Sequence, residues 1–170
     1  MKEISKYQNI FLDRDGVINQ VIDRNSVISS PWSFSEFVIK KEFRNFYEKY
    51  KSKSFFVVTN QPDISRKNLK YSELEKMHSF LKGEFNFTEI IHCPHDNYHK
   101  CLCRKPKPGM ILDLIHRYNL IKTESILIGD SEKDVLSGNS AGIKTIFLQT
   151  DYNTNPYSKN TIIIRSLNDL

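Results

Sequence analysis

The sequence has no apolar run approaching the roughly 18 residues that a membrane-spanning helix needs, and its first six residues contain no apolar signal core. It also has no internal repeat, no low-complexity tract and no linker-like segment. These absences argue against a membrane helix and a repeat architecture, and we expect a cytoplasmic location. At 170 residues, with 39% hydrophobic and 26% charged residues, the chain fits one globular domain spanning residues 1–170.

Cysteine is scarce, and its few copies are clustered at Cys93, Cys101 and Cys103. An odd number of cysteines in a reducing compartment argues against a disulfide framework. The pairs Cys93-Pro-His95 and Cys101-Leu-Cys103 instead supply three thiolates and one imidazole, which is a ligand set for tetrahedral Zn²⁺. Because four protein ligands leave no open position, we expect a structural zinc site in this loop.

Three histidines compete for the fourth position of that zinc site. His95 is favoured by its pairing with Cys93, whereas His92 adjoins a strand end and His99 has a less regular spacing. We expect His78 and His116, which fall in helical segments, to have no special role.

Short apolar runs alternate with longer amphipathic segments along the chain. The runs are continuously apolar and rich in β-branched and aromatic residues, at positions 9–12, 54–58, 89–91, 125–128, 144–148 and 161–165. Such runs are typical of strands buried on both faces of a parallel sheet. Alternation with helices predicts an α/β fold with a doubly wound parallel sheet.

Four helices are expected between these strands. One apolar stripe covers residues 34–50, and the capping-box spacing from Ser72 to Glu75 opens a second helix that Gly83 closes. Pro108 opens a third helix. The fourth begins at Ser131 as its N-cap and ends near residue 142.

Polar residues follow three of the predicted strands. Asp13 and Asp15 come after the first strand, residues 59–61 after the second, and Asp130 after the fourth. In doubly wound sheets, ligands bind beyond the carboxyl ends of the strands, so these side chains are expected at one rim. Carboxylates gathered in this way suit Mg²⁺ together with a phosphate substrate.

Four segments in chain order resemble the four motifs of the haloacid-dehalogenase (HAD) superfamily of phosphatases. They are Phe11-Leu-Asp13-Arg-Asp15-Gly, Val57-Val-Thr59-Asn60, Lys105 before Pro106, and Ile128-Gly-Asp130-Ser-Glu-Lys-Asp134. One such motif alone would be moderate evidence for the family. Four motifs in the same order, spread over almost the whole chain, are strong evidence.

The resemblance implies a Mg²⁺-dependent phosphatase that works through an aspartyl-phosphate. Asp13 would be the nucleophile and a metal ligand. Asp15 would be the general acid and base, with its backbone carbonyl on Mg²⁺. Thr59 would hydrogen-bond the phosphoryl oxygens, and Lys105 would balance the charge of the nucleophile and the phosphoryl group. Asp130 would complete the metal site.

The same resemblance assigns supporting and substrate-binding residues. Asp134 would support the metal site or Lys105. The zinc loop and the following Arg-Lys-Pro-Lys-Pro-Gly-Met run resemble the small-cap branch that contains heptose 1,7-bisphosphate 7-phosphatases and histidinol-phosphate phosphatases. This branch has no large cap domain. It implies that Arg104 contacts the substrate and that Asn60 and Gln61 line the pocket, with loops 19–32 and 61–67 and the zinc loop around it.

Two positions depart from the pattern of that branch. Ser131 stands directly after Asp130, where many bisphosphatases have a basic residue, so the contact to a second substrate phosphate stays open. Lys40-Lys41 stands where the branch commonly has Pro-Gly. Neither departure affects the expected catalytic set.

The function expected first is removal of the 7-phosphate from D-glycero-D-manno-heptose 1,7-bisphosphate, and the enzyme alternative is histidinol-phosphate phosphatase. The net charge of +5 suggests a rival of another class, a zinc-stabilised nucleic-acid-binding module. That rival needs a basic stripe with stacking aromatic residues, which the cysteine loop does not offer. We therefore expect a monomer acting on a small phosphorylated substrate, with no nucleic-acid or membrane partner.

Overall fold

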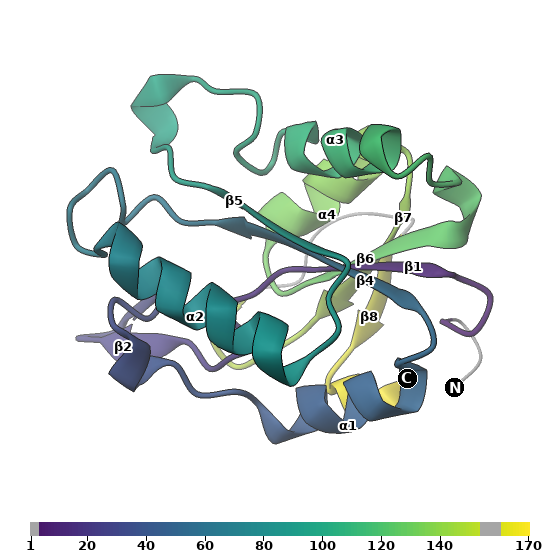
Figure 1. Ribbon diagram of the computed structural model, residues 1–170, viewed down its shortest axis with the longest axis horizontal. Helices are drawn as coiled ribbons and strands as arrows, with labels where there is room; N and C mark the ends of the chain where they lie inside the picture. Colours follow the sequence, from purple (N-terminus) through teal and green to yellow (C-terminus); the bar gives the residue numbers. More distant parts are fainter. Residues whose placement is uncertain (1–3, 154–160) are drawn as a thin grey trace.

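The computed structural model describes residues 4–153 and 161–170. They build one six-stranded sheet in the order β5-β4-β1-β6-β7-β8, and all neighbouring strands in it are parallel (Figure 1). The strands are β1 (Asn9–Leu12), β4 (Ser54–Asn60), β5 (Glu89–Cys93), β6 (Ser125–Gly129), β7 (Lys144–Leu148) and β8 (Thr161–Ile164). The predicted parallel α/β sheet is confirmed, and each predicted apolar run is one of its strands.

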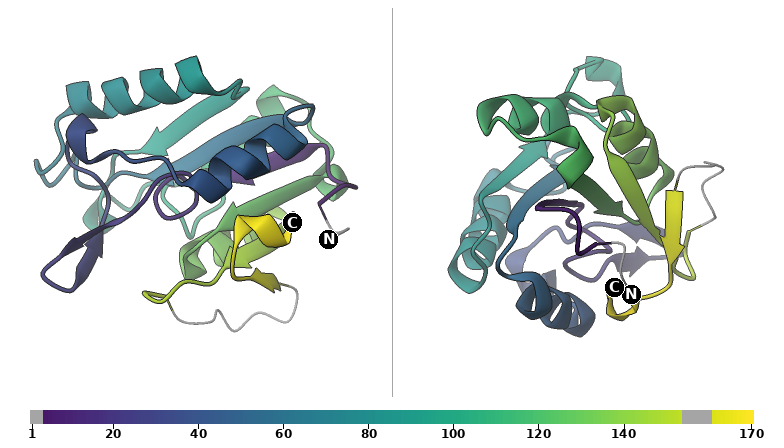
Figure 2. Two further views of the ribbon diagram at one scale, coloured as in Figure 1. Left: turned by 90° about the horizontal axis from the view of Figure 1, so that it is seen from below. Right: turned by 90° about the vertical axis from the view of Figure 1, so that its right-hand side faces the viewer.

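Helices cover both faces of the sheet (Figures 1 and 2). On one face lie α1 (Lys41–Tyr50) and α2 (Tyr71–Glu84), and on the other α3 (Gly109–Arg117) and α4 (Glu132–Ala141). Strand side chains alternate between two cores: Ile10 and Leu12 pack in the first, whereas Phe11 packs in the second. This two-sided burial explains why the strands are continuously apolar.

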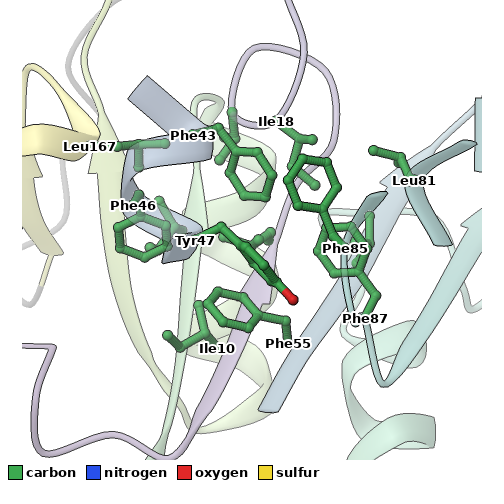
Figure 3. Packing of buried hydrophobic residues seen from close by; sticks show 14 of the residues in the cluster. Ile10, Ile18, Phe43, Phe46, Tyr47, Phe55, Leu81, Phe85, Phe87 and Leu167 are labelled. Atoms are coloured by element: carbon green, nitrogen blue, oxygen red, sulfur yellow. The ribbon is translucent and has the colours of Figure 1, made fainter. Parts of the chain in front are cut away.

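The core under α1 is built largely from aromatic rings (Figure 3). Phe43 meets Phe85 edge-on with ring centroids 5.1 Å apart, and Tyr47 lies 5.2 Å from Phe55. Such pairs contribute about 0.5–1.5 kcal/mol each beyond the area they bury. The end of α2 and the segment after it are thereby held against α1 and the sheet.

The helix predicted over residues 34–50 is wrong in its first half. Only the short 3₁₀ turn η1 (Phe34–Glu36) forms there, and α1 starts at Lys41. Between them the chain is extended, because the Val38 carbonyl accepts from Gln20 N–H and the Lys40 N–H donates to the Ile18 carbonyl. Pairing with a distant segment therefore replaces the helix that the local apolar stripe favoured.

The predicted ends of the second helix are also wrong. Its N-cap is Lys70, which makes no side-chain capping bond, so Ser72 lies inside the helix. Gly83 is helical as well, and the chain turns extended at Phe85, whose ring packs against Phe43 and Tyr47. Burial of that aromatic ring outweighs the local stop signal.

The other two helices begin where they were predicted to begin. Helix α3 starts directly after Pro108, and the Ser131 side chain caps α4 in a capping box with Asp134. Gly142 ends α4 in the left-handed conformation, with φ +78°.

A hairpin of β2 (Ile22–Arg24) and β3 (Val27–Ser29) was not predicted inside the 19–32 loop. Figure 2 (left) shows it standing out from the body of the molecule. The remaining short turns are η2 (Asn97–His99), η3 (Lys122–Glu124) and η4 (Leu167–Asp169). In the described ranges no helix has the length and apolar character to cross a membrane.

Candidate active site

The acidic residues meet where β1 and β6 end. Because β1 pairs with β6, Asp13 and Asp130 leave neighbouring strands at the same edge of the sheet. One carboxylate oxygen from each, and one from Asp134 on α4, lie within 4.8 Å of one another. The structure thus brings Asp13 together with Asp130 and Asp134, from which it is separated by more than a hundred residues in the sequence.

This acidic cluster is short of positive charge. Burial, followed by the charge of Asp134, raises the pKa of Asp13 well above its usual value, although Lys105 acts against the shift. Burial and Asp134 also raise the pKa of Asp130 to about 7, against the hydrogen bond from Tyr152. A bound cation would reverse both shifts, because it favours the ionised carboxylates.

Lys105 is the buried cation of the site. Its ammonium group donates to the Val58 carbonyl at 2.9 Å and to Asp134 Oδ1 at 2.5 Å, and it lies 2.9 Å from Asp13 Oδ1. These contacts engage all three ammonium protons. Burial acts to lower the pKa of Lys105, but the charges of Asp13 and Asp134 outweigh it and the pKa is raised.

Asn60 holds the backbone of Lys105 in place. Its amide nitrogen donates to the Lys105 carbonyl and its amide oxygen accepts from the Lys105 N–H, both at 3.0 Å. The sequence had suggested that Thr59 and Asn60 follow the strand, but both belong to β4 itself. Asn60 lines the cavity described below, so its side chain faces the substrate space while it positions Lys105.

Gln61 was expected to line the substrate pocket, but the structure places it elsewhere. Its side chain is fully buried and lies outside the described lining of the cavity. The amide nitrogen donates to Thr59 Oγ1 at 2.9 Å and to Asp15 Oδ2 at 2.7 Å. The geometry therefore makes Gln61 a support for Asp15 and Thr59.

A cavity of about 790 Å³ opens over these groups. The cavity is large enough for a small ligand. Its lining includes Asp13, Asp15, Lys105 and Asp130. The rest of the lining was not predicted residue by residue and includes Arg24, Val27, Ile28, Trp32, Asp63, Arg66, Lys133 and Tyr152, together with the predicted Arg104.

The β2–β3 hairpin forms one wall of the cavity, and a sequence signal for it existed. Asn25 and Ser26 both have positive φ, +55° and +66°, as a tight two-residue hairpin turn requires. The apolar residues on either side of this turn could have marked it. Directly before the turn, the Arg24 guanidinium stacks 3.8 Å from the centroid of Trp32 and pairs with Glu36 at 2.5 Å.

Tyr152 is a further site residue that sequence reasoning missed. Its hydroxyl donates to Asp130 Oδ2 at 2.7 Å, and Asn153 donates to the Asp130 backbone carbonyl at 2.7 Å. Gly16, with φ +86°, leaves the room for this contact, because a Cβ there would lie 1.9 Å from Asp130 Oδ2. No local pattern in the sequence pointed to Tyr152.

The cysteine loop forms a separate cluster. Cys93 Sγ lies 3.6 Å from both His95 Nδ1 and Cys101 Sγ, while Cys103 Sγ lies 3.3 Å from His95 Nδ1 and 3.2 Å from Cys93 Sγ. Ligand atoms on a tetrahedral Zn²⁺ are separated by about 3.5–3.8 Å, whereas a disulfide needs about 2.05 Å. The donor set and its spacing therefore fit zinc and not a disulfide.

His95 belongs to this cluster, whereas His92 and His99 do not within the part of the chain that is described. His92 packs beside His78, and His99 Nδ1 accepts from the Asp96 N–H at 3.1 Å. The loop also positions Arg104, whose guanidinium donates to the His95 carbonyl at 3.1 Å. The cysteine cluster is thus linked directly to the cavity wall.

Known proteins resemble this chain over most of its length. A family model of HAD-hydrolase-like proteins matches residues 102–170. The D-glycero-beta-D-manno-heptose-1,7-bisphosphate 7-phosphatase of Neisseria meningitidis serogroup A is 36% identical over 148 residues, covering 83% of this chain and 76% of that protein. The D-glycero-alpha-D-manno-heptose-1,7-bisphosphate 7-phosphatase of Photorhabdus laumondii is 30% identical, covering 96% of this chain and 94% of that protein. The chain belongs to the haloacid-dehalogenase superfamily of phosphatases.

Structural similarity agrees with this membership. The crystal structure of D,D-heptose 1,7-bisphosphate phosphatase from B. bronchiseptica, complexed with magnesium and phosphate, superposes with a TM-score of 0.83 at 25% identity. It covers 94% of this chain and 93% of that one. The bifunctional histidine-biosynthesis protein HisB of Buchnera aphidicola is 33% identical, but the match spans only 39% of it.

In this HAD phosphatase the residues that the structure describes include no large cap domain over the site, as the sequence predicted. The cavity is walled by short segments: the β2–β3 hairpin, the segment after β4 and the cysteine loop. These are the three regions expected from the family resemblance, and Tyr152 after β7 adds a fourth wall.

Proposed function

We propose that this HAD phosphatase removes the 7-phosphate of D-glycero-D-manno-heptose 1,7-bisphosphate through an aspartyl-phosphate on Asp13. The observation that carries the proposal is the pairing of Asp13 with Lys105 at 2.9 Å, beside Asp130, at the floor of an open cavity. The names of the relatives from Neisseria and Photorhabdus support this substrate.

Two steps complete the reaction. A carboxylate oxygen of Asp13 attacks the phosphorus, the bond to the sugar oxygen breaks, and the proton of the Asp15 carboxylic acid passes to that oxygen. Water then attacks the phosphorus, Asp15 takes its proton, and inorganic phosphate leaves the regenerated Asp13 carboxylate. Lys105 balances negative charge on the nucleophile and on the phosphoryl oxygens throughout. The family resemblance gives Thr59 a hydrogen bond from its hydroxyl group to the phosphoryl oxygens, although its side chain is fully buried beside Gln61 in this structure.

Mg²⁺ fits the acidic cluster. Its donors are hard carboxylate oxygens, and the raised pKa values of Asp13 and Asp130 mark a place where a cation stabilises the ionised forms. Asp13, Asp130 and the Asp15 backbone carbonyl would hold the ion, with Asp134 supporting Lys105. When bound, Mg²⁺ screens the charge of the nucleophile against the anionic substrate.

Zn²⁺ fits the second cluster as a structural ion. Cys93, His95, Cys101 and Cys103 supply a closed ligand set for it. Its function in the proposal is to hold the loop that carries Arg104, whose Nε also donates to Asn97 Oδ1 at 2.9 Å.

The charge of the cavity wall favours a bisphosphate over the histidinol phosphate of the alternative. Outside the catalytic floor the cavity lining contains four cationic residues, Arg24, Arg66, Arg104 and Lys133, against two acidic ones, Asp63 and Glu132. Such cations suit a second phosphate, whereas the amine and imidazole of histidinol phosphate need acidic partners. Because one relative is a HisB protein, histidinol phosphate is included as a substrate in the test below. We further propose a cytoplasmic monomer without a nucleic-acid partner.

Steady-state kinetics on the two candidate substrates test this function. We expect kcat/KM for D-glycero-D-manno-heptose 1,7-bisphosphate to exceed that for histidinol phosphate by at least about 10²-fold, and chelation of Mg²⁺ to abolish turnover. Asp13→Asn should lower kcat by at least about 10³-fold. The control Asp113→Asn alters a half-exposed side chain of α3 that pairs with Arg117, and it should change nothing. Equal or better turnover of histidinol phosphate would refute the substrate, and an active Asp13→Asn would refute the mechanism.

A further inference from the structure

Arg14 lies directly between Asp13 and Asp15, yet its side chain is fully buried and lies outside the described lining of the cavity. It is the largest fully buried side chain of the described residues. Burying a guanidinium is costly unless its charge is paired and its N–H groups are hydrogen-bonded. A purely apolar residue would serve packing at lower cost, so the charge of Arg14 calls for a function.

The charge of Arg14 is paired with the Asp15 carboxylate. Nη2 lies 2.9 Å from Oδ1 and 3.1 Å from Oδ2, and Nε lies 3.1 Å from Oδ1. Asn19 donates to Oδ1 at 2.9 Å and Gln61 to Oδ2 at 2.7 Å. Donors from three residues thus fix both carboxylate oxygens, and the Asp15 side chain keeps 15% of its surface exposed at the cavity.

Arg14 is itself held from the side away from Asp15. His78 Nε2 on α2 lies 3.4 Å from Arg14 Nη1, and the guanidinium carbon lies 5.4 Å from the centroid of the Phe37 ring. Because arginine can only donate, His78 Nε2 is the acceptor and its proton lies on Nδ1. Burial, followed by the charge of Arg14, lowers the pKa of His78 to about 3, so the imidazole stays a neutral acceptor.

The surroundings of this pair contain no competing acid among the described contacts. His92 of β5 lies beside His78 with ring centroids 5.5 Å apart and the rings tilted by 56°, and burial and Arg14 lower the pKa of His92 as well. Asp15 is the only carboxylate that pairs with Arg14 in the described part of the chain. The orientation of the guanidinium is therefore passed on to Asp15 alone.

We propose that Arg14, held by His78, is a positioning residue that aims the Asp15 carboxyl group at the leaving-group oxygen. The inference rests on the proposed function, in which Asp15 protonates that oxygen. Misplacing a catalytic group by about 1 Å can cost roughly 10²-fold in rate. The penalty should be largest for leaving groups that need the proton and small for those that depart as anions.

Two aryl phosphates isolate this role from the identity of the natural substrate. Phenol, with a pKa of about 10 like that of tyrosine, needs the proton, whereas p-nitrophenol is a far better leaving group. We expect Arg14→Gln to lower kcat/KM for phenyl phosphate by about 10²-fold, but for p-nitrophenyl phosphate by less than about tenfold. The KM for both should stay within about threefold. His78→Leu, which removes only the acceptor, should shift the ratio in the same direction by about threefold.

Two further variants decide between the outcomes. Asp15→Asn is the reference and should show the largest discrimination between the two substrates. Arg44→Gln, which removes an exposed ion pair with Glu84 on the same side of the sheet, should leave the ratio unchanged. Equal losses on both substrates for Arg14→Gln and His78→Leu, with discrimination intact in Asp15→Asn, would overturn the positioning role alone. Absence of discrimination in Asp15→Asn would overturn the acid role in the proposed function, and the inference with it.

Discussion

Replacing Lys105 with methionine should destabilise the metal-free protein strongly. Lys105 is 2% exposed and contacts Asp13, Asp134 and the Val58 carbonyl. Methionine keeps much of the volume but leaves two buried carboxylates unpaired. Breaking a buried pair in this way costs about 3–5 kcal/mol, which lowers the Tm of a domain of this size by about 6–20 °C.

The loss should depend on pH in a definite direction. Asp13 has a pKa raised above its unfolded value even beside Lys105, and without the ammonium group its pKa rises further. A group with a raised folded pKa costs stability as pH rises through that value, because the unfolded chain ionises first. The deficit of Lys105→Met should therefore be larger at pH 7.5 than at pH 5.

Urea denaturation with chelated metals measures this difference. The matched control is Lys51→Met, since Lys51 lies 2.9 Å from Glu48, the same distance that separates Lys105 from Asp13, but on an exposed surface. The control should lose less than about 1 kcal/mol. A deficit below about 1 kcal/mol for Lys105→Met, or one that grows on acidification, would refute the reasoning.

Two further predictions concern the histidine and cysteine residues. The partly buried His78, with its pKa lowered to about 3, stays neutral below about pH 6.5, where the histidine of the unfolded chain binds a proton. The wild type therefore loses free energy of unfolding as the pH falls below 6.5. Between pH 6.5 and pH 5 its loss should exceed that of His78→Asn by about 2 kcal/mol. Equal losses for the two proteins in denaturation curves would contradict this. Protein purified without a metal-affinity step should contain about one zinc per chain, and Cys101→Ser should lower zinc content and Tm together. Absence of zinc in elemental analysis of the active wild type would refute the site.

Local sequence was sufficient where a side chain is placed by its own strand or loop. Asp13 follows β1 directly and Asp130 follows β6 directly, so the apolar runs alone predicted the rim at which both lie. The cysteine cluster was predictable for the same reason, because all four of its residues lie between positions 93 and 103. Short chain segments restrict such residues to one neighbourhood whatever the rest of the fold does.

Tertiary structure decided which side chains support these groups. Gln61 reaches Asp15 across 46 positions, Arg14 reaches His78 across 64, and Tyr152 reaches Asp130 across 22. These contacts exist because β1 lies between β4 and β6, because β7 lies beside β6, and because α2 packs over one face of the sheet. No local periodicity encodes that order of strands. The same cause delays the start of the predicted 34–50 helix to Lys41, since residues 38–40 pair with the segment after β1. Backbone hydrogen bonds and buried charge pairs between distant segments outweigh local propensity, which amounts to only tenths of a kcal/mol per residue.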